Sequence, residues 1–194
     1  MLTLQSTSLV LIGKFNPYII SPEWLRINDI WSAVDTRLSL GAAGGDGVQF
    51  RGGKIEWRIT HNRFSLSSIE KPIGELAAKV MGELPHTPME STLSTFSFLA
   101  ESDGFIGPVF EAIGNVCPGN DLTPELSRWG AVFHEDETRV DLMFVSGDEG
   151  TTISVLRHRP TRTAQDAILA ASEYSIDLRK SEQLVNHFIQ GNDS

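Results

Sequence analysis

The sequence feature that most constrains the fold is a pattern of structural breaks that recurs after about 86 residues. Pro22 and Pro108 each stand in the first turn of an expected helix, and each helix follows a strand, centred near residue 10 or 96. Turns near residues 52 and 61 have counterparts near residues 136 and 148. A fixed spacing of this kind is typical of an internal duplication. The sequence therefore predicts two tandem β-α-β-β-β-α units, about residues 1–90 and 91–194, in one domain spanning residues 1–194.

Each unit is expected to contain three short alternating strands joined by tight turns, the strongest local signal of hairpins. In the first unit they lie between residues 48 and 66, with turns at Gly52 and His61, and an additional strand precedes them at about residues 36–40. In the second unit they cover about residues 127–134, 138–146 and 151–158. Two small units of this kind can share a core by forming one sheet. We therefore expect an α+β fold with one largely antiparallel sheet of about eight or nine strands and the helices packed on one face.

Helix starts are marked by residues that suit the first turn of a helix. Ser21 can cap a helix that opens at Pro22 and carries an apolar stripe from Trp24 to Val34. Further helices are expected after Pro72 and Asp103. Thr163 and Asp166 resemble a capping box, which predicts the start of one long C-terminal helix.

Charge and cysteine content restrict the classes of partner. The net charge is −9, and the excess lies entirely in residues 91–194, which carry sixteen acidic and seven basic residues. Such a surface repels phosphate backbones, so nucleic acid is not an expected partner; the acidic residues either keep the protein soluble or form a face for a basic protein. The apolar run at residues 9–12 is too short for a signal peptide or a membrane span. The single cysteine, Cys117, suits a reducing compartment, and we expect a cytoplasmic protein without membrane contact.

No motif in the chain matches a known catalytic, cofactor or metal signature. The glycine-rich stretch at residues 41–47 lacks the Gly-Lys-Ser/Thr ending of a phosphate loop and precedes a strand. Cys117 has no neighbouring base and is interpreted as a structural thiol. His134 and the acids up to Glu137 are interpreted as an exposed acidic turn, because their spacing fits neither zinc nor calcium. The sequence therefore predicts no catalytic residue, cofactor or metal, although Cys117, His134 and His158 could converge in space.

The most suggestive polar cluster precedes the C-terminal helix. Arginine side chains and the free N–H groups of a helix start both suit a carboxylate or phosphate. A groove between sheet and helices could place this cluster beside tryptophans. The candidate ligand-binding residues are Arg157, His158, Arg159, Arg162, Trp24 and Trp57. The alternative is that the arginines pair with acids of the same chain.

The end of the C-terminal helix is a candidate dimer interface. Its apolar residues recur at a spacing of 3–4 and continue beyond the length that one small sheet needs. They can pack on the same chain or against a second copy. The residues concerned are Leu184, Val185, Phe188 and Ile189.

Three classes of function follow. The leading one is a non-enzymatic protein-interaction module, homodimeric and with an acidic C-terminal half. The alternative is a small-ligand-binding protein that holds an anionic group near Arg157, Arg159 and Arg162. The third is an enzyme whose site is not visible as a motif.

Overall fold

The computed structural model describes residues 2–33, 35–40, 47–70, 72–101, 128–147 and 149–190, with the backbone alone for Ser39, Leu40 and Gln190. Three expectations lie outside these residues. They concern most of the glycine-rich stretch at residues 41–47, the helix expected after Asp103, and Cys117.

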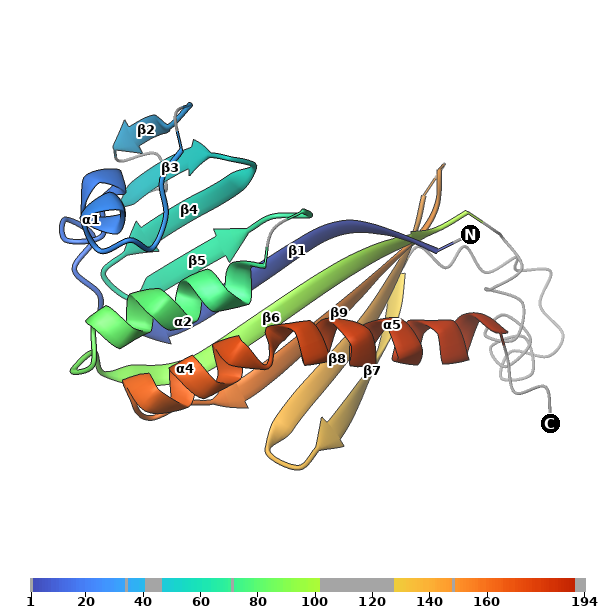
Figure 1. The fold of residues 1–194 in the computed structure, drawn as a ribbon. Helices are drawn as coiled ribbons and strands as arrows, with labels where there is room; N and C mark the ends of the chain where they lie inside the picture. The colour runs from blue at the N-terminus through green and yellow to red at the C-terminus, as the bar shows by residue number, and fades with distance from the viewer. Residues whose placement is uncertain are drawn as a thin grey trace, which may run out of the picture.

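The described strands form one nine-stranded antiparallel sheet in the order β2-β3-β4-β5-β1-β6-β9-β8-β7 (Figure 1). Two long strands, β1 (Leu2–Gly13) and β6 (Met89–Ala100), pair at its centre. On one side of them lie β5 (Arg63–Ser67), β4 (Ile55–Thr60), β3 (Val48–Gly52) and β2 (Arg37–Leu40). On the other side lie β9 (Gly150–Pro160), β8 (Thr138–Gly147) and β7 (Arg128–Glu135). The expected α+β class with an antiparallel sheet is confirmed.

Left-handed backbone positions close two of the hairpins. Gly53 and Lys54 have φ values of +54° and +66° between β3 and β4, as the tight turns that match strand twist require. Asp136, with φ of +51°, occupies a comparable position between β7 and β8. Aspartate tolerates this conformation better than most residues. These turns therefore arise from local sequence, as the prediction of hairpins assumed.

The first helix is shorter than its apolar stripe indicated. Helix α1 (Pro22–Ile27) begins as expected, with the Ser21 hydroxyl accepting the Trp24 N–H at 3.1 Å. It ends because the side chain of Asn28 donates to the Trp24 carbonyl at 2.8 Å, and Asp29 then turns to φ of +52°. The expectation that the helix continues past Trp31 is therefore wrong. Trp31 instead reaches the core from the segment that follows the helix.

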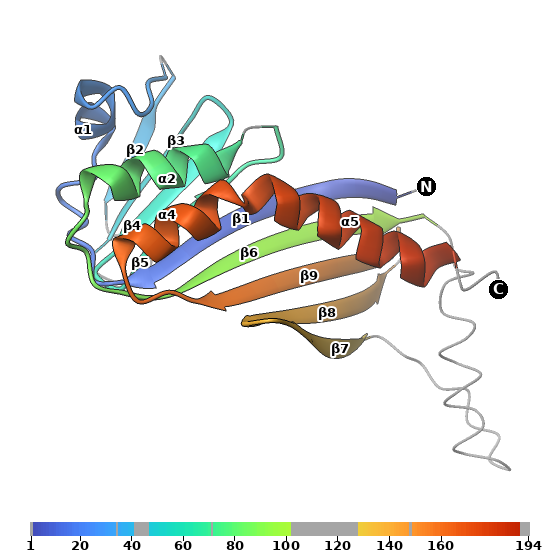
Figure 2. The ribbon, with the colours of Figure 1, turned by 60° about the horizontal axis from the view of Figure 1, so that its bottom comes forward.

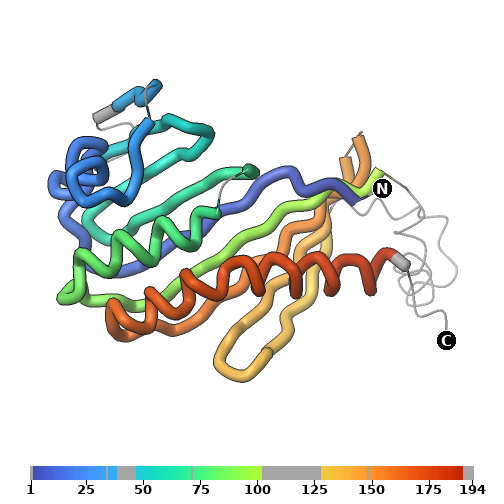
Figure 3. The backbone as a smooth tube through the Cα atoms, viewed as in Figure 1, coloured from blue at the N-terminus to red at the C-terminus, as the bar shows by residue number. Residues whose placement is uncertain are grey.

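The long C-terminal helix is divided in two. Helix α4 (Ala164–Ser172) begins with the predicted capping box of Thr163 and Asp166, and α5 (Tyr174–Gln190) follows after Glu173. At the division the Ser172 hydroxyl donates to the Ile168 carbonyl at 2.8 Å. A serine bond of this type competes with the backbone ladder and bends helices. The division places the two helices at different angles over the sheet (Figure 3).

Helices α2 (Ile73–Glu83), α4 and α5 lie on one face of the sheet (Figure 2). We call this the helix face and the opposite one the open face, since no helix among the described residues covers it. Gly74 lets α2 approach the junction of α4 and α5 closely, because a side-chain carbon there would clash with the Ala171 carbonyl oxygen of α4 and lie 2.5 Å from Cβ of Tyr174 in α5. Strand residues of the helix face carry most of the core, and among them Phe50, Trp57 and Phe64 form an aromatic group with Trp31.

Candidate functional site

The structure places the predicted cluster of Arg157, His158, Arg159 and Arg162 on both faces of β9 and in the segment that follows it. Strand alternation in β9 directs Arg157 and Arg159 toward the helices, while His158 lies half-buried between them in sequence, on the open face. Arg162 follows the strand, before α4, and is exposed. The strand therefore separates His158 from Arg157 and Arg159, and Arg162 lies beyond the end of the strand.

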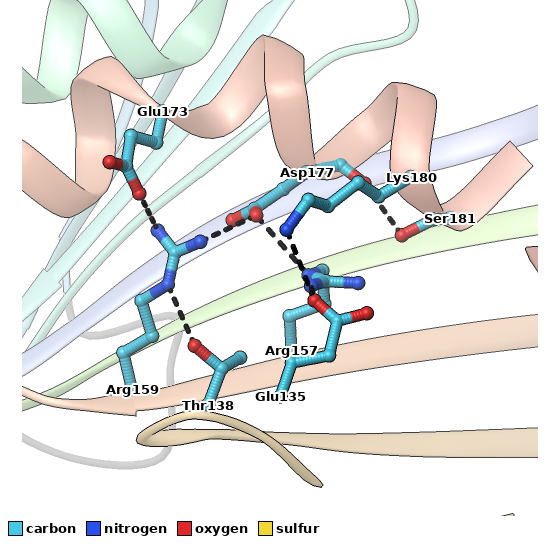
Figure 4. A network of polar contacts seen from close by, with 8 residues as sticks. All are labelled: Glu135, Thr138, Arg157, Arg159, Glu173, Asp177, Lys180 and Ser181. Atoms are coloured by element: carbon cyan, nitrogen blue, oxygen red, sulfur yellow. Dashed lines mark hydrogen bonds and ion pairs between the residues drawn. The ribbon is translucent and has the colours of Figure 1, made fainter. Parts of the chain in front are cut away.

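Arg157 is buried in an ion-pair network under α5 (Figure 4). Its side chain is only 1% exposed, and its Nε lies 3.2 Å from Oδ1 of Asp177, which is 2% exposed. Its Nη2 donates to the Glu135 carboxylate at the end of β7, which also accepts from Lys180 Nζ at 3.2 Å. This chain of contacts ties β7, β9 and α5 together.

Arg159 extends the same network toward α4. Its Nη2 lies 2.6 Å from Asp177 Oδ1, and its Nη1 lies 2.9 Å from Glu173 Oε2. Its Nε donates to the Thr138 hydroxyl at 3.1 Å, and the Ser181 hydroxyl donates to the Asp177 carbonyl at 2.7 Å. Three cationic side chains thus meet three carboxylates, so the network is balanced in charge. Arg157 and Arg159 thus pair with acids of the same chain, which was the alternative to ligand binding that the sequence left open.

The pKa values of Asp177 and Glu135, two carboxyl groups of the network, shift in opposite directions. Burial raises the pKa of Asp177, and the nearby Arg159 and Arg157 offset only part of that rise. Burial also acts to raise the pKa of Glu135, but hydrogen bonds and charge from Arg157 and Lys180 outweigh it and lower that pKa. The difference follows from depth, because Glu135 is partly solvated and Asp177 is not. The network therefore contains one carboxylate that reaches solvent, Glu135, and one that is enclosed by protein, Asp177.

Arg159 and Arg162 also line a cavity of about 610 Å³ between the ends of β8 and β9 and helix α4. Glu137, Asp166 and Glu173 line the same cavity. An anion entering it would meet three carboxylates and only two guanidinium groups, one of which is already paired. Electrostatics therefore disfavours this cavity as an anion site.

The tryptophans assigned to a ligand groove belong to the core. Trp57 is fully buried and stacks on Phe50 with ring centroids 5.5 Å apart. Trp24 is half-buried on α1 and packs against the same core. Trp57 thus stabilises the sheet–helix contact and has no surface open to a ligand.

The apolar residues near the end of α5 pack on the sheet of their own chain. Val185 is fully buried, and the Phe188 ring lies 6.1 Å from the rings of both Phe133 and Phe144. Leu184 and Ile189 are partly buried against the core. Val185 is therefore inaccessible to a second copy. A dimer through this helix could use only the partly buried residues Leu184, Phe188 and Ile189.

Strand β7 is a second candidate for association, at an edge of the sheet. It is the last strand in the sheet order of the described residues, and Val132 at its middle is 53% exposed. Five consecutive residues from Trp129 to Phe133 carry no charge. At the other edge, β2 has four residues and begins with Arg37. Short, charged edge strands resist pairing with other chains, whereas long apolar ones invite it.

No site for metal chemistry is evident among the described residues, since none of their His, Cys, Asp and Glu side chains form a group of three able to hold an ion. None of the described helices is long and apolar enough to span a bilayer. His134 is exposed near the end of β7, and Cys117 lies outside the described residues, so their proposed convergence with His158 stays untested.

No protein-family model matches the chain, and a search of curated proteins finds no significant match.

Proposed function

We propose that this chain is a non-enzymatic interaction module that forms a homodimer through β7. The observation that carries the proposal is the contrast between the two edges of the sheet. Strand β2 is short and starts with an arginine, whereas β7 presents eight residues with an uncharged middle. An unprotected edge offers backbone N–H and C=O groups to another strand.

A two-fold axis perpendicular to the sheet would join two β7 strands in antiparallel fashion and keep the helices of both copies on one side. Directly opposed residues then belong to the same face, so Val132 of each copy can lie at the axis. Burial of this exposed side chain adds apolar area to the backbone bonds. Exposed acids outside β7, such as Asp166 of α4, would remain accessible to a basic partner protein in this arrangement.

The expected assembly is tested by sedimentation of the whole protein at micromolar concentration. We expect a species of about twice 21.3 kDa for the unmodified chain and a 21.3 kDa species for Val132→Lys. Leu38→Lys is the matched control, because Leu38 is similarly exposed, at 55%, on the opposite edge strand. A monomeric unmodified chain, or dissociation by Leu38→Lys alone, would contradict the proposal.

We further propose that the sheet arose by duplication of a β-α-β-β-β-α unit. The strand order supports this, since β3-β4-β5-β1 on one side of the centre corresponds to β7-β8-β9-β6 on the other. The central β1–β6 pair would then lie at the boundary between the halves. Superposition of the halves in an experimental structure is the test, and a poor fit of these four-strand groups would rule the duplication out.

A further inference from the structure

A second feature of the molecule lies far from β7, at the end of the β3–β4 hairpin. A cavity of about 570 Å³ opens there, and we call it the arginine hollow because Arg37 and Arg51 line it. Strand β1 forms part of its wall with Ser6 and Thr7, beyond the point where pairing with β5 ends at Ser8. The hollow is therefore a consequence of β1 being much longer than β5.

Arg37 and Arg51 are direct partners in the β2–β3 register. Side chains opposed in this way have Cβ atoms about 5 Å apart, and like charges so placed destabilise a sheet. Both side chains are exposed, yet neither forms an ion pair or side-chain hydrogen bond within the described part of the chain. Among the described residues, two guanidinium groups thus face the same space without a directly bonded carboxylate.

The acidic residues around the hollow are already engaged. Glu70 accepts both of its bonds from Lys54 Nζ, at 2.7 and 2.6 Å. Asp35 accepts the Gly53 N–H at 3.2 Å, and Glu56 accepts from Gln49 Nε2 at 3.0 Å. Glu56 is the register partner of Arg51 in β4, but its nearest ion pair is with Arg58, at 3.6 Å. With Lys54, the hollow is lined by three cationic and three acidic side chains. Lys54 neutralises Glu70, whereas Asp35 and Glu56 accept hydrogen bonds from neutral donors, so the N–H donors of Arg37 and Arg51 are not bound by any acid among the described residues.

We propose that Arg37 and Arg51 bind a small organic anion in the arginine hollow, through a phosphate or carboxylate group. A guanidinium group presents a planar set of donors that fits either group, and an anion between two of them relieves their repulsion. The hydroxyls of Ser6 and Ser67 lie in the same wall and supply further donors. The volume falls within the range of about 300–1,000 Å³ that small ligands occupy.

A small ligand is favoured over a nucleic acid because the positive surface is confined. Nucleic-acid binding depends on many phosphate contacts, whereas the hollow offers two unpaired arginines on a chain with a net charge of −9. The site is independent of the β7 interface, which lies at the opposite edge of the sheet. Failure of either proposal therefore leaves the other intact.

Calorimetric titration of the full chain with inorganic pyrophosphate and, separately, with citrate tests the site. Arg37→Gln and Arg51→Gln should each weaken binding about 10- to 100-fold, the usual effect of losing a charge-assisted contact. Arg179→Gln is the control, because Arg179 is exposed on α5, has no partner among the described residues, and gives the same change in net charge. It should alter the affinity less than about two-fold.

The outcomes separate the chemistry of the ligand from the existence of the site. Binding of pyrophosphate alone assigns phosphate, and binding of citrate alone assigns carboxylate. Lack of binding of both at millimolar concentration overturns the proposal, as does an equal loss in Arg179→Gln. Thermal unfolding of the Arg37 and Arg51 variants at or above the temperature of the unmodified chain, expected because each substitution relieves like-charge repulsion, excludes a general loss of fold.

Discussion

Asp177 of α5 and Arg157 of β9 form an ion pair that is almost completely enclosed by the protein, with Oδ1 and Nε 3.2 Å apart. Arg159 shares the same carboxylate at 2.6 Å. The pair joins a helix to a strand that lies some twenty residues earlier in the chain. Removal of one partner from a buried ion pair leaves an uncompensated charge and is strongly destabilising. Substitution of Asp177 therefore tests whether this pair holds α5 against β9.

Removal of the central carboxylate should destabilise the fold strongly. Asp177→Ala leaves Arg157 buried without its enclosed counter-charge, and we expect a loss of about 3–5 kcal/mol in the free energy of unfolding. The double variant Arg157→Met, Asp177→Leu should lose less, because it removes both charges. Urea unfolding gives both values. Arg26→Ala, which breaks an exposed pair with Glu23, should leave the free energy of unfolding nearly unchanged, and an equally small effect of Asp177→Ala would contradict the burial.

Acid should weaken the contact of Glu135 with Arg157 and Lys180. Since these partners lower the pKa of Glu135 in the folded state, its stabilising effect is complete above its ordinary pKa of 4.5. It is then lost as pH falls through the lowered value. Asp177 acts in the opposite sense, because burial raises its pKa and the folded state binds its proton more readily.

The measurement that isolates Glu135 is a comparison of the unmodified chain with Glu135→Gln at a series of pH values. The difference in unfolding free energy should be constant from neutral pH to about pH 5 and should shrink below about pH 4. A difference that does not change with pH would show that the Glu135 carboxylate contributes no charge interaction.

Two glycines of α2 should respond in opposite ways to the same substitution. A side-chain carbon at Gly74 would clash with Ala171 O of α4 and Tyr174 Cβ of α5, so Gly74→Ala should push α2 away from these helices and lower stability by about 1–3 kcal/mol. Gly82 has no atom within 4 Å of that position, so Gly82→Ala should raise stability by up to about 1 kcal/mol. Thermal unfolding of the two variants decides, and a stabilised Gly74→Ala would disprove the close helix contact.

Val185 should act as a core residue. Val185→Ala removes two buried methyl groups and should cost about 1–3 kcal/mol, and Val185→Asp should prevent folding. Circular dichroism and urea unfolding distinguish this from a role in dimerisation, where the variant would remain folded and change only its sedimentation. A folded, monomeric Val185→Asp would place this residue at an interface after all.

Local sequence determined most of the secondary structure. Gly53 and Asp136 accept the backbone conformations of tight turns, Ser21 and Thr163 cap helices, and the alternation around Trp57 marks a strand with one buried face. Each of these signals acts over a few residues, so the sequence contains all the information needed to read it. Where a signal was too weak, as at the end of α1, a single side chain of Asn28 decided the boundary.

Tertiary structure alone decided which charged residues meet. Arg157 and Arg159 stand beside Arg162 in the sequence, but strand alternation and the position of α5 bring the first two onto Asp177, whereas Arg162 stays exposed. Arg37 and Arg51 are fourteen positions apart and attract no notice as a motif, yet the β2–β3 register opposes them. The physical reason is that electrostatic energy depends on distance and burial, and both are set by long-range strand pairing and helix packing that no local pattern encodes.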